Sequence, residues 1–310
     1  MSKTSGVFFG KLVSGKRLPR SFFLLGFLVF QQAPPPSEIY LATFDAPGKL
    51  QASAVNISNS PGYDNQPSFL PDGSAILFSS HRGDVVQTDI YKYDLKTKAV
   101  TQLTKTPESE FSPLVTPDGK SFSVIRQGTD GSQFLWRYDL DGSNGRPALA
   151  NINPVGYHVW TDATHLLLFV LGAQGKPNTL QYADAATGTA DVIDSSIGRS
   201  LLRRPGTTTF SYISKPAGGH WVVKSFDPKT RATATIVETV DQNQSEDCAW
   251  MPDGRLLMAT GLKLMAWSNG SSWTELADFS SLGSGRITRL AVSSLRSDGF
   301  SSAPMLAFVK

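Results

Sequence analysis

The chain has 310 residues, 18% of them charged, and contains 27 glycines, 19 prolines and 18 phenylalanines. This composition favours a turn-rich globular β protein over a helical bundle, a coiled coil or a disordered chain. The single cysteine, Cys248, excludes an intrachain disulfide bond and a cysteine-built zinc or iron–sulfur site.

Charge is unevenly distributed along the chain, which changes the meaning of the formal net charge of +3. Five of the 29 basic residues lie in residues 1–33, and this segment holds no acidic residue. The other 24 basic residues stand against 26 acidic residues, so residues 34–310 have a net charge of −2. A near-neutral body has no excess charge with which to release counterions from phosphates, so we expect no nucleic-acid partner.

Residues 1–33 have the pattern of a secretory signal peptide. Their basic residues precede a short apolar run at residues 21–30, and Ala33 precedes a proline-rich stretch. We predict cleavage after Ala33 and a mature chain that is periplasmic or secreted. The apolar run is shorter than the ~20 residues that a transmembrane helix needs, so we expect no transmembrane helix in the mature chain. The alternatives are an uncleaved short anchor and a buried strand.

A repeat of about 45 residues follows. Its clearest copies are residues 66–78 and 112–124, whose turns Pro71-Asp72-Gly73 and Pro117-Asp118-Gly119 are 46 residues apart. Proline presets φ and glycine accepts a positive φ, so each tripeptide predicts a turn between two short apolar strands. A third copy at residues 249–258 lies three periods further along the chain.

Three weaker copies occupy the remaining positions of the repeat. Residues 159–169 and 202–212 are degraded copies at the expected phase, and a last copy at residues 289–300 runs on to residues 305–309. The period is therefore kept at six positions, which an open β-sandwich does not explain.

Each complete copy continues into a third and a fourth strand. In the first copy, residues 89–94 alternate in polarity, residues 95–98 form a turn, and residues 99–104 make a fourth strand. Four antiparallel strands in about 45 residues are typical of one propeller blade. We therefore predict an all-β fold, a six-bladed β-propeller that occupies residues 34–310.

The sixth copy ends at Lys310 before its third and fourth strands. Residues 38–44 and 50–57 have the phase of such a strand pair, at the opposite end of the chain. We predict that these N-terminal strands complete the C-terminal blade and close the ring, which removes exposed sheet edges.

The stretch 67–119 resembles the WD-type repeats of TolB-like six-bladed propellers, through its two Pro-Asp-Gly turns, Asp89-Ile90-Tyr91 and Gln102-Leu103-Thr104. The resemblance extends to the blade at Pro252 and is weakest in the two central blades. It implies a bacterial envelope protein, usually a docking platform. TolB also has an N-terminal domain, for which residues 33–38 leave no room, so the resemblance covers the propeller alone and does not imply a role in the Tol–Pal system.

Polar residues precede the predicted innermost strands, at the position expected to ring the central channel. We predict that they bind a polar small molecule or a peptide terminus at the channel mouth. The alternative is a solvated rim of local salt bridges. The predicted contacts are Asp64, Glu110, His158, Arg199, Asp247 and Arg286, with Arg289 as an alternative to Arg286.

Signals for a metal or an active site are weak. His81 and His220 are expected on the same face as His158, and His165 on the opposite face, but no short-range histidine pair fixes a ligand geometry. No Gly-x-Ser-x-Gly motif occurs, and no α/β-hydrolase domain follows the repeats. We therefore predict no metal and no cofactor, and read Cys248 as a small buried hydrophobic residue.

These observations favour an exported binding protein without chemistry of its own, whose partner is an envelope protein or a small polar ligand. The alternative is a hydrolase or lyase that acts on a carbohydrate or peptide with His158 and a carboxylate at the channel mouth. A third possibility is a purely structural role within a larger envelope complex.

Overall fold

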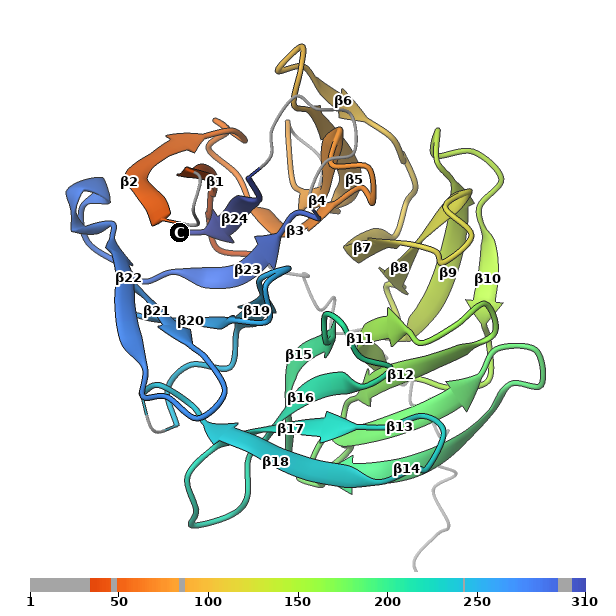
Figure 1. The fold of residues 1–310 in the computed structure, drawn as a ribbon. Helices are drawn as coiled ribbons and strands as arrows, with labels where there is room; N and C mark the ends of the chain where they lie inside the picture. Colours follow the sequence, from red (N-terminus) through yellow and green to blue (C-terminus); the bar gives the residue numbers. More distant parts are fainter. Residues whose placement is uncertain (1–33, 46–48, 84–86, 242, 295–302) are drawn as a thin grey trace, which may run out of the picture. The chain divides into compact units, whose positions relative to one another are not determined.

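The regular secondary structure of the described residues is β-strand, apart from one 3-10 turn at Ser280–Leu282. A computed structural model describes residues 34–310 except 46–48, 84–86, 242 and 295–302 (Figure 1). The predicted signal peptide and residues 295–302 of the last repeat copy lie outside the described residues.

Six four-stranded antiparallel sheets, here called blades 1 to 6, make up the described part of the chain (Figure 1). Blade 1 contains β3 (Asp64–Phe69), β4 (Ala75–Ser80), β5 (Asp89–Asp94) and β6 (Val100–Gln102). Blade 2 contains β7 (Ser109–Val115), β8 (Ser121–Gln127), β9 (Gln133–Asp139) and β10 (Arg146–Leu149). Blade 3 contains β11 (Val155–Trp160), β12 (His165–Val170), β13 (Thr179–Asp184) and β14 (Thr189–Ser195).

The remaining blades follow the same plan. Blade 4 contains β15 (Ile197–Arg203), β16 (Phe210–Ser214), β17 (Val222–Phe226) and β18 (Thr233–Glu238). Blade 5 contains β19 (Cys248–Trp250), β20 (Leu256–Thr260), β21 (Lys263–Trp267) and β22 (Thr274–Asp278). Blade 6 contains β23 (Thr288–Val292), β24 (Met305–Val309), β1 (Ile39–Asp45) and β2 (Lys49–Asn56).

The Pro-Asp-Gly tripeptides form the turns that the sequence predicts. In blade 1 the Gly73 N–H donates to the Leu70 carbonyl at 2.9 Å, with Gly73 at φ 67°. The Asp72 carboxylate accepts a bond from the Ser74 N–H at 2.9 Å. Gly119 has the same φ in blade 2. Glycine tolerates this backbone conformation and aspartate satisfies the next N–H, so the tripeptide fixes the link between first and second strands.

Burial differs between the second and the fourth strand of a blade. The second strands β4, β16 and β24 are buried along their whole length. The fourth strands β14 and β18 are mostly exposed. A second strand has a partner strand on each side and another blade against its faces, so its sequence is a continuous apolar run rather than an alternating one.

The hydrophobic core lies between neighbouring blades. One cluster joins Leu167 and Tyr182 of blade 3 to Phe210, Tyr212 and Phe226 of blade 4. The rings of Tyr182 and Phe226 lie 5.4 Å apart, centroid to centroid. Full burial of one such large side chain stabilises the fold by about 1.5–3 kcal/mol, so adjacent blades stabilise each other.

Pairing of the N-terminal strand β1 with the C-terminal strand β24 closes the ring. Ile39 lies opposite Val309 in this antiparallel pair, and β2 pairs with the other edge of β1. Beyond the strands, the backbone groups of Glu38 and Lys310 exchange hydrogen bonds of 2.9 and 3.0 Å. The predicted closure is confirmed.

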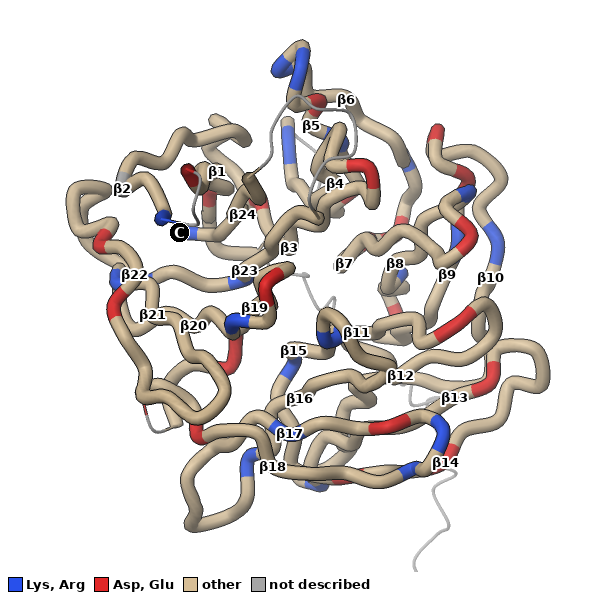
Figure 2. Tube along the Cα trace, in the orientation of Figure 1, with Lys and Arg blue, Asp and Glu red and all other residues tan. Residues whose placement is uncertain are grey.

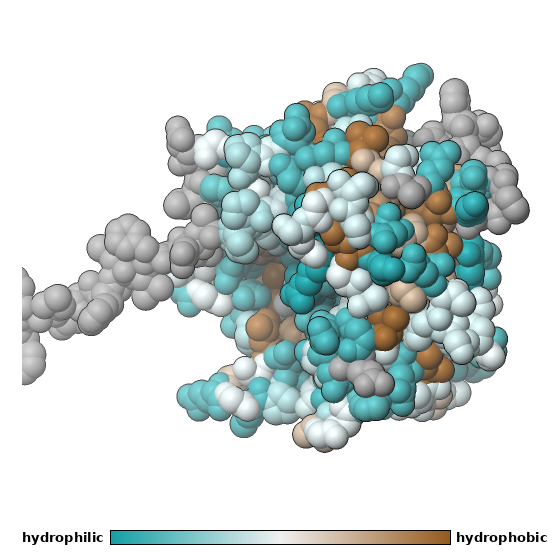
Figure 3. Space-filling view, turned by 90° about the vertical axis from the view of Figure 1, so that its left-hand side faces the viewer, coloured by the Kyte–Doolittle hydropathy of each residue, from teal (hydrophilic) through white to brown (hydrophobic). Residues whose placement is uncertain are grey.

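The surface carries mixed charge. In the view of Figure 2, basic and acidic residues are scattered over all the blades. The side view in Figure 3 shows hydrophobic residues in small groups among hydrophilic ones. No helix in the described part of the chain is long and apolar enough to cross a membrane.

The closing strand gives the first prediction. Ile39 is fully buried, so Ile39→Ala should lower the free energy of unfolding by about 3 kcal/mol. The matched control is Val55→Ala in β2 of the same blade, where a side chain that is 66% exposed should change stability by less than about 0.5 kcal/mol. Urea denaturation followed by tryptophan fluorescence measures both free energies of unfolding. Equal losses in the two variants would contradict the claim that β1 stabilises the closed ring.

Candidate functional site

One hydrogen bond provides the same reference point in all six blades. A backbone N–H at the end of the innermost strand donates across the turn to the start of the second strand, at 2.8–3.0 Å. The donors are Leu70, Thr116, Thr161, Arg204, Met251 and Ser293. This common position allows the channel residues of the six blades to be compared directly.

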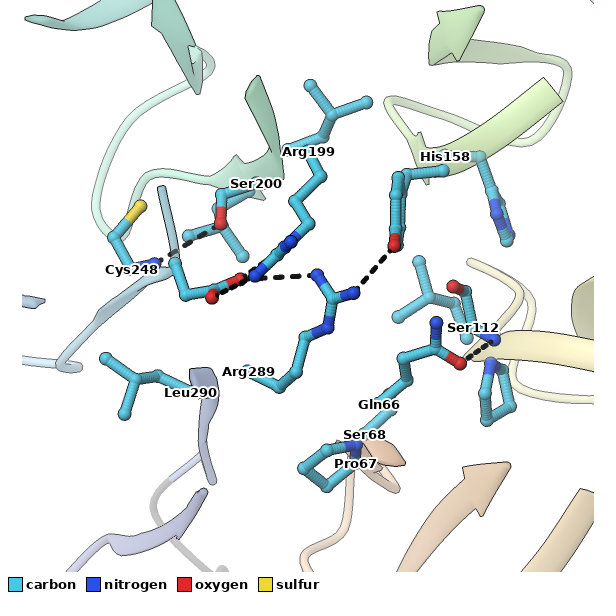
Figure 4. Close-up of a pocket in the computed structure, with 16 residues that line it drawn as sticks. Gln66, Pro67, Ser68, Ser112, His158, Arg199, Ser200, Cys248, Arg289 and Leu290 are labelled. Carbon is cyan, nitrogen blue, oxygen red and sulfur yellow. Dashed lines mark hydrogen bonds and ion pairs between the residues drawn. The ribbon is translucent and has the colours of Figure 1, made fainter. Parts of the chain in front are cut away.

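Four positions before that donor, every blade contributes a residue to one central cavity of about 120 Å³, here called the channel cavity (Figure 4). These six residues, the polar ring, are Gln66, Ser112, Tyr157, Ser200, Asp247 and Arg289. The next residue of each blade also lines the cavity and forms a second ring: Pro67, Pro113, His158, Leu201, Cys248 and Leu290. The cavity is therefore polar at one level and largely apolar at the next.

A β-bulge explains how two consecutive residues can face one cavity. The pairing between the first two strands shifts register inside β3, β7, β11, β15 and β23. Gln66, Ser112 and Arg289 lie at these irregularities with φ of 55°, 54° and 53°. Non-glycine residues seldom adopt positive φ, and such strained positions concentrate at functional sites. The bulge turns the polar ring toward the cavity.

A partly buried ionic network connects two members of the polar ring, Asp247 and Arg289, with the neighbouring Arg199. Arg199 donates to both carboxylate oxygens of Asp247, at 2.8 Å from Nε and 2.5 Å from Nη2. Arg289 donates to the same carboxylate at 3.3 Å. Figure 4 shows the two guanidinium groups turned toward each other across the cavity. One carboxylate thus joins blades 4, 5 and 6.

Further contacts hold Arg289 in place. Its Nη2 donates to the Tyr157 hydroxyl at 2.8 Å, and its Nε donates to the Asn65 side-chain carbonyl at 3.2 Å. The guanidinium carbon lies 5.2 Å from the centre of the Tyr157 ring. Arg289 is therefore fixed from blades 1, 3 and 5 at once.

Burial and charge act against each other in this network. Burial raises the pKa of Asp247, and the Arg199 guanidinium opposes that shift. For Arg199, burial lowers the pKa while Asp247 and Glu246 raise it, and the net shift is upward. Arg199 is thus a permanent cation, and Glu246 provides it with a further ion pair at 3.1 Å.

Two buried polar atoms on the cavity wall have no hydrogen-bond partner among the described residues. They are the Ser112 hydroxyl oxygen and Nδ1 of His158. The other nitrogen of His158 lies 2.6 Å from the Ser123 hydroxyl. Burial lowers the pKa of His158 to about 3, so the imidazole is neutral at physiological pH. An unpartnered buried polar atom costs about 1–3 kcal/mol, which a bound water or ligand would recover.

Two pockets adjoin the polar ring. The first, of about 260 Å³, is here called the side pocket and shares Gln66, Tyr157 and Arg289 with the channel cavity. The second, of about 200 Å³, shares Arg199 and Asp247 with it. The polar ring therefore lies where the channel cavity meets both pockets.

The structure brings three of the six sequence-predicted contacts to the channel cavity. Arg199 and Asp247 belong to the ionic network, and His158 belongs to the second ring. Arg286 is exposed and lines the second pocket, whereas its alternative Arg289 lies in the polar ring.

Asp64 and Glu110 do not reach the cavity. Both are fully buried inside their blades. Asp64 accepts bonds from Ser80 at 2.6 Å and Arg82 at 3.1 Å, and Glu110 is bonded to the Tyr138 hydroxyl. Each lies two residues before a polar-ring residue, so the predicted channel position was two residues too early in blades 1 and 2.

Sequence reasoning missed Ser112 and Ser200, whereas the stretches expected at the channel mouth included Gln66 and Tyr157 without naming them as contacts. The signal for them was the turn itself, because counting back four residues from the turn donor finds the polar ring in every blade. Among the described residues, no group of three or more His, Cys, Asp or Glu side chains could hold a metal ion. Burial raises the pKa of Cys248 to about 12, which leaves its thiol protonated.

Solved structures with the same arrangement include several six-bladed propellers. A TolB candidate from Agrobacterium tumefaciens is 14% identical with a TM-score of 0.66, over 89% of this chain and 98% of that chain. The chain has the TolB-like six-bladed propeller fold. TolB from Acinetobacter baumannii is 16% identical with a TM-score of 0.55, and the match covers 88% of this chain but only 63% of that chain.

Enzymes share the fold as well. An oligogalacturonate lyase from Vibrio parahaemolyticus is 14% identical with a TM-score of 0.50, over 90% of this chain and 98% of that chain. The chain matches no protein-family model. At these identities the TolB-like propellers share the fold with this chain, and function has to be argued from the site.

The buried imidazole predicts a pH dependence. The unfolded chain protonates His158 below a pKa of about 6.5, whereas the folded chain does so only near 3, so stability falls as pH falls through this window. When the pH falls from 7.5 to 5, His158 should lower the free energy of unfolding by about 2 kcal/mol. His158→Gln should remove that loss, measured as the difference between urea unfolding free energies at the two pH values. An unchanged difference would contradict a neutral buried imidazole.

The ionic network predicts that an isosteric substitution of Asp247 destabilises the fold. Asp247→Asn leaves two partly buried guanidinium groups without their shared carboxylate and should lower the unfolding free energy by about 3 kcal/mol. The control is Asp253→Asn, where a half-exposed ion pair with Arg255 should contribute less than about 1 kcal/mol. Equal losses in the two variants would show that the network is not strongly coupled.

Proposed function

We propose that this propeller is an exported binding protein of a bacterial envelope that captures a protein segment or a small polar ligand at the mouth of its channel. The observation that carries the proposal is the polar ring, in which all six blades turn one residue toward a single cavity. Strained backbone at three of these positions and unpartnered polar atoms on the wall support a site kept for binding.

The chemistry of the cavity wall supports binding rather than catalysis. Asp247 is the one carboxylate among the described residues that line the channel cavity, and both of its oxygens are bonded to Arg199. A general base needs a free lone pair and a pKa near the working pH. Asp247 is held as the ion-pair partner of Arg199 and Arg289, and the pKa of His158, about 3, lies far below the working pH, so the hydrolase or lyase alternative is not favoured.

Export is the second part of the proposal. It is supported by the basic and apolar pattern of residues 1–33, and a TolB-like fold is consistent with a docking role outside the cytoplasm. The proposed partner is an envelope protein that presents a projecting segment, because a cavity of about 120 Å³ admits a chain end or one small molecule rather than a flat surface.

Cross-linking in the native envelope, followed by affinity capture of the tagged protein, tests this proposal. The variant Arg199→Gln with Arg289→Gln removes both channel cations. The matched control, Arg146→Gln with Arg231→Gln, removes two arginines that are about half exposed, one on β10 and one in the turn before β18.

We expect a stoichiometric partner that the wild type and the control retain and that the channel variant loses at least tenfold. A partner held equally by all three proteins would place the binding surface elsewhere. Capture of no partner by any of them would overturn the docking role.

A further inference from the structure

The side pocket next to the polar ring has a composition that specifies one class of ligand. Its walls are mostly aromatic and aliphatic, with Tyr63, Phe111, Tyr157 and Phe169 as the aromatic residues, and its polar lining includes Gln133 and Arg289. Its volume of about 260 Å³ is below the roughly 300–1,000 Å³ of sites for drug-sized molecules. It is large enough for a single bulky side chain.

Two aromatic pairs form the walls. The rings of Tyr63 and Phe111 meet edge to face with centroids 6.4 Å apart, and those of Tyr157 and Phe169 do so at 5.5 Å. Gly156 makes room for the second pair, because a Cβ atom there would lie 2.9 Å from the Phe169 ring. The walls are therefore preformed and suited to an aromatic or large aliphatic group.

Arg289 is the one charged side chain among the described residues that line this pocket. Among the described residues, its bonds to Asn65, Asp247 and Tyr157 use three of its five N–H donors and hold the guanidinium still. A fixed guanidinium with donors to spare is suited to a carboxylate, which it can bind through two oxygens. Asp247 is the one carboxylate paired with Arg289 among the described residues, and it also pairs with Arg199, which has Glu246 as a second partner.

We propose that the side pocket binds the carboxyl-terminal residue of a peptide, with its apolar side chain between the aromatic walls and its α-carboxylate on Arg289. This inference rests on the proposed function and names the ligand of the same site. The α-carboxylate and the side chain are attached to one Cα atom, so a chain end places both groups within a pocket this small. The rest of the peptide leaves toward the channel mouth.

The test uses fluorescence polarisation with the full-length protein and a fluorescein-labelled peptide, Gly-Ser-Gly-Ser-Phe, with a free carboxyl end. Two comparison probes carry a C-terminal amide or a terminal serine in place of phenylalanine. We expect the free acid ending in phenylalanine to bind at least tenfold more tightly than either. Equal binding of the amide would overturn the role of the carboxylate, and equal binding of the serine peptide would overturn the role of the aromatic walls.

Two variants in the side pocket test whether the peptide binds there. Arg289→Gln should abolish the preference for the free acid. Gln133→Glu adds a negative charge to the pocket lining without changing the size of the side chain, so it should weaken the free acid several-fold and leave the amide unchanged. This second variant keeps the test valid if Arg289→Gln does not fold. Arg146→Gln on an outer strand is the control and should bind like the wild type.

The failure of this inference is distinguishable from the failure of the proposed function. If no peptide shows a preference for its free carboxyl end but the channel variant still loses its envelope partner, the ligand class is wrong and the docking role stands. If neither peptides nor an envelope partner bind, both proposals are overturned.

Discussion

Closure of the ring by β1 and β24 is the constraint on which the site depends. The pairing of Ile39 with Val309 holds β24 in place, and β24 in turn pairs with β23, which carries Arg289. Arg289 bonds to side chains of blades 1, 3 and 5, so its position depends on how blade 6 packs against the rest of the closed ring. If the β1–β24 pair opened, Arg289 would separate from Asp247 and the ion pairs at the channel would break.

The network itself is costly to bury. Moving charged groups out of water carries a penalty of several kcal/mol per ion, and well-packed apolar residues are often as stable as a buried ion pair. Here Arg199 and Arg289 share the Asp247 carboxylate, and Arg199 forms a second ion pair with Glu246. Fixed polar groups beside an apolar pocket are the usual composition of a ligand site, which agrees with the binding role proposed for this region.

The turns made most of the fold predictable from the sequence. Pro-Asp-Gly, with its fixed backbone demands, recurs at a constant period, and the N-terminal strands have the phase of the missing pair in blade 6. The channel residues were less predictable. The position just before the innermost strands pointed to Asp64 and Glu110, but the channel position lies two residues further along, where the register shifts hold Gln66 and Ser112.

The side pocket was beyond the reach of the sequence for a related reason. Tyr63, Phe111 and Phe169 come from three blades and lie far apart in the sequence. Only the closed ring brings them together, so the sequence alone does not predict that they share a pocket. The same holds for Arg286 and Arg289, which the sequence left as alternatives. The turn donor at Ser293 decides between them, because it places Arg289 at the level of Asp247.

The most direct test of the central claim is site-specific photo-cross-linking in living cells. A photoreactive amino acid replaces either Gln133, which lines the side pocket, or Val192, which is 64% exposed on the outer strand β14. Binding at the channel mouth predicts a discrete adduct from position 133 and none from position 192. An adduct from position 192 alone, or from neither position, would contradict a binding site at the mouth of the propeller.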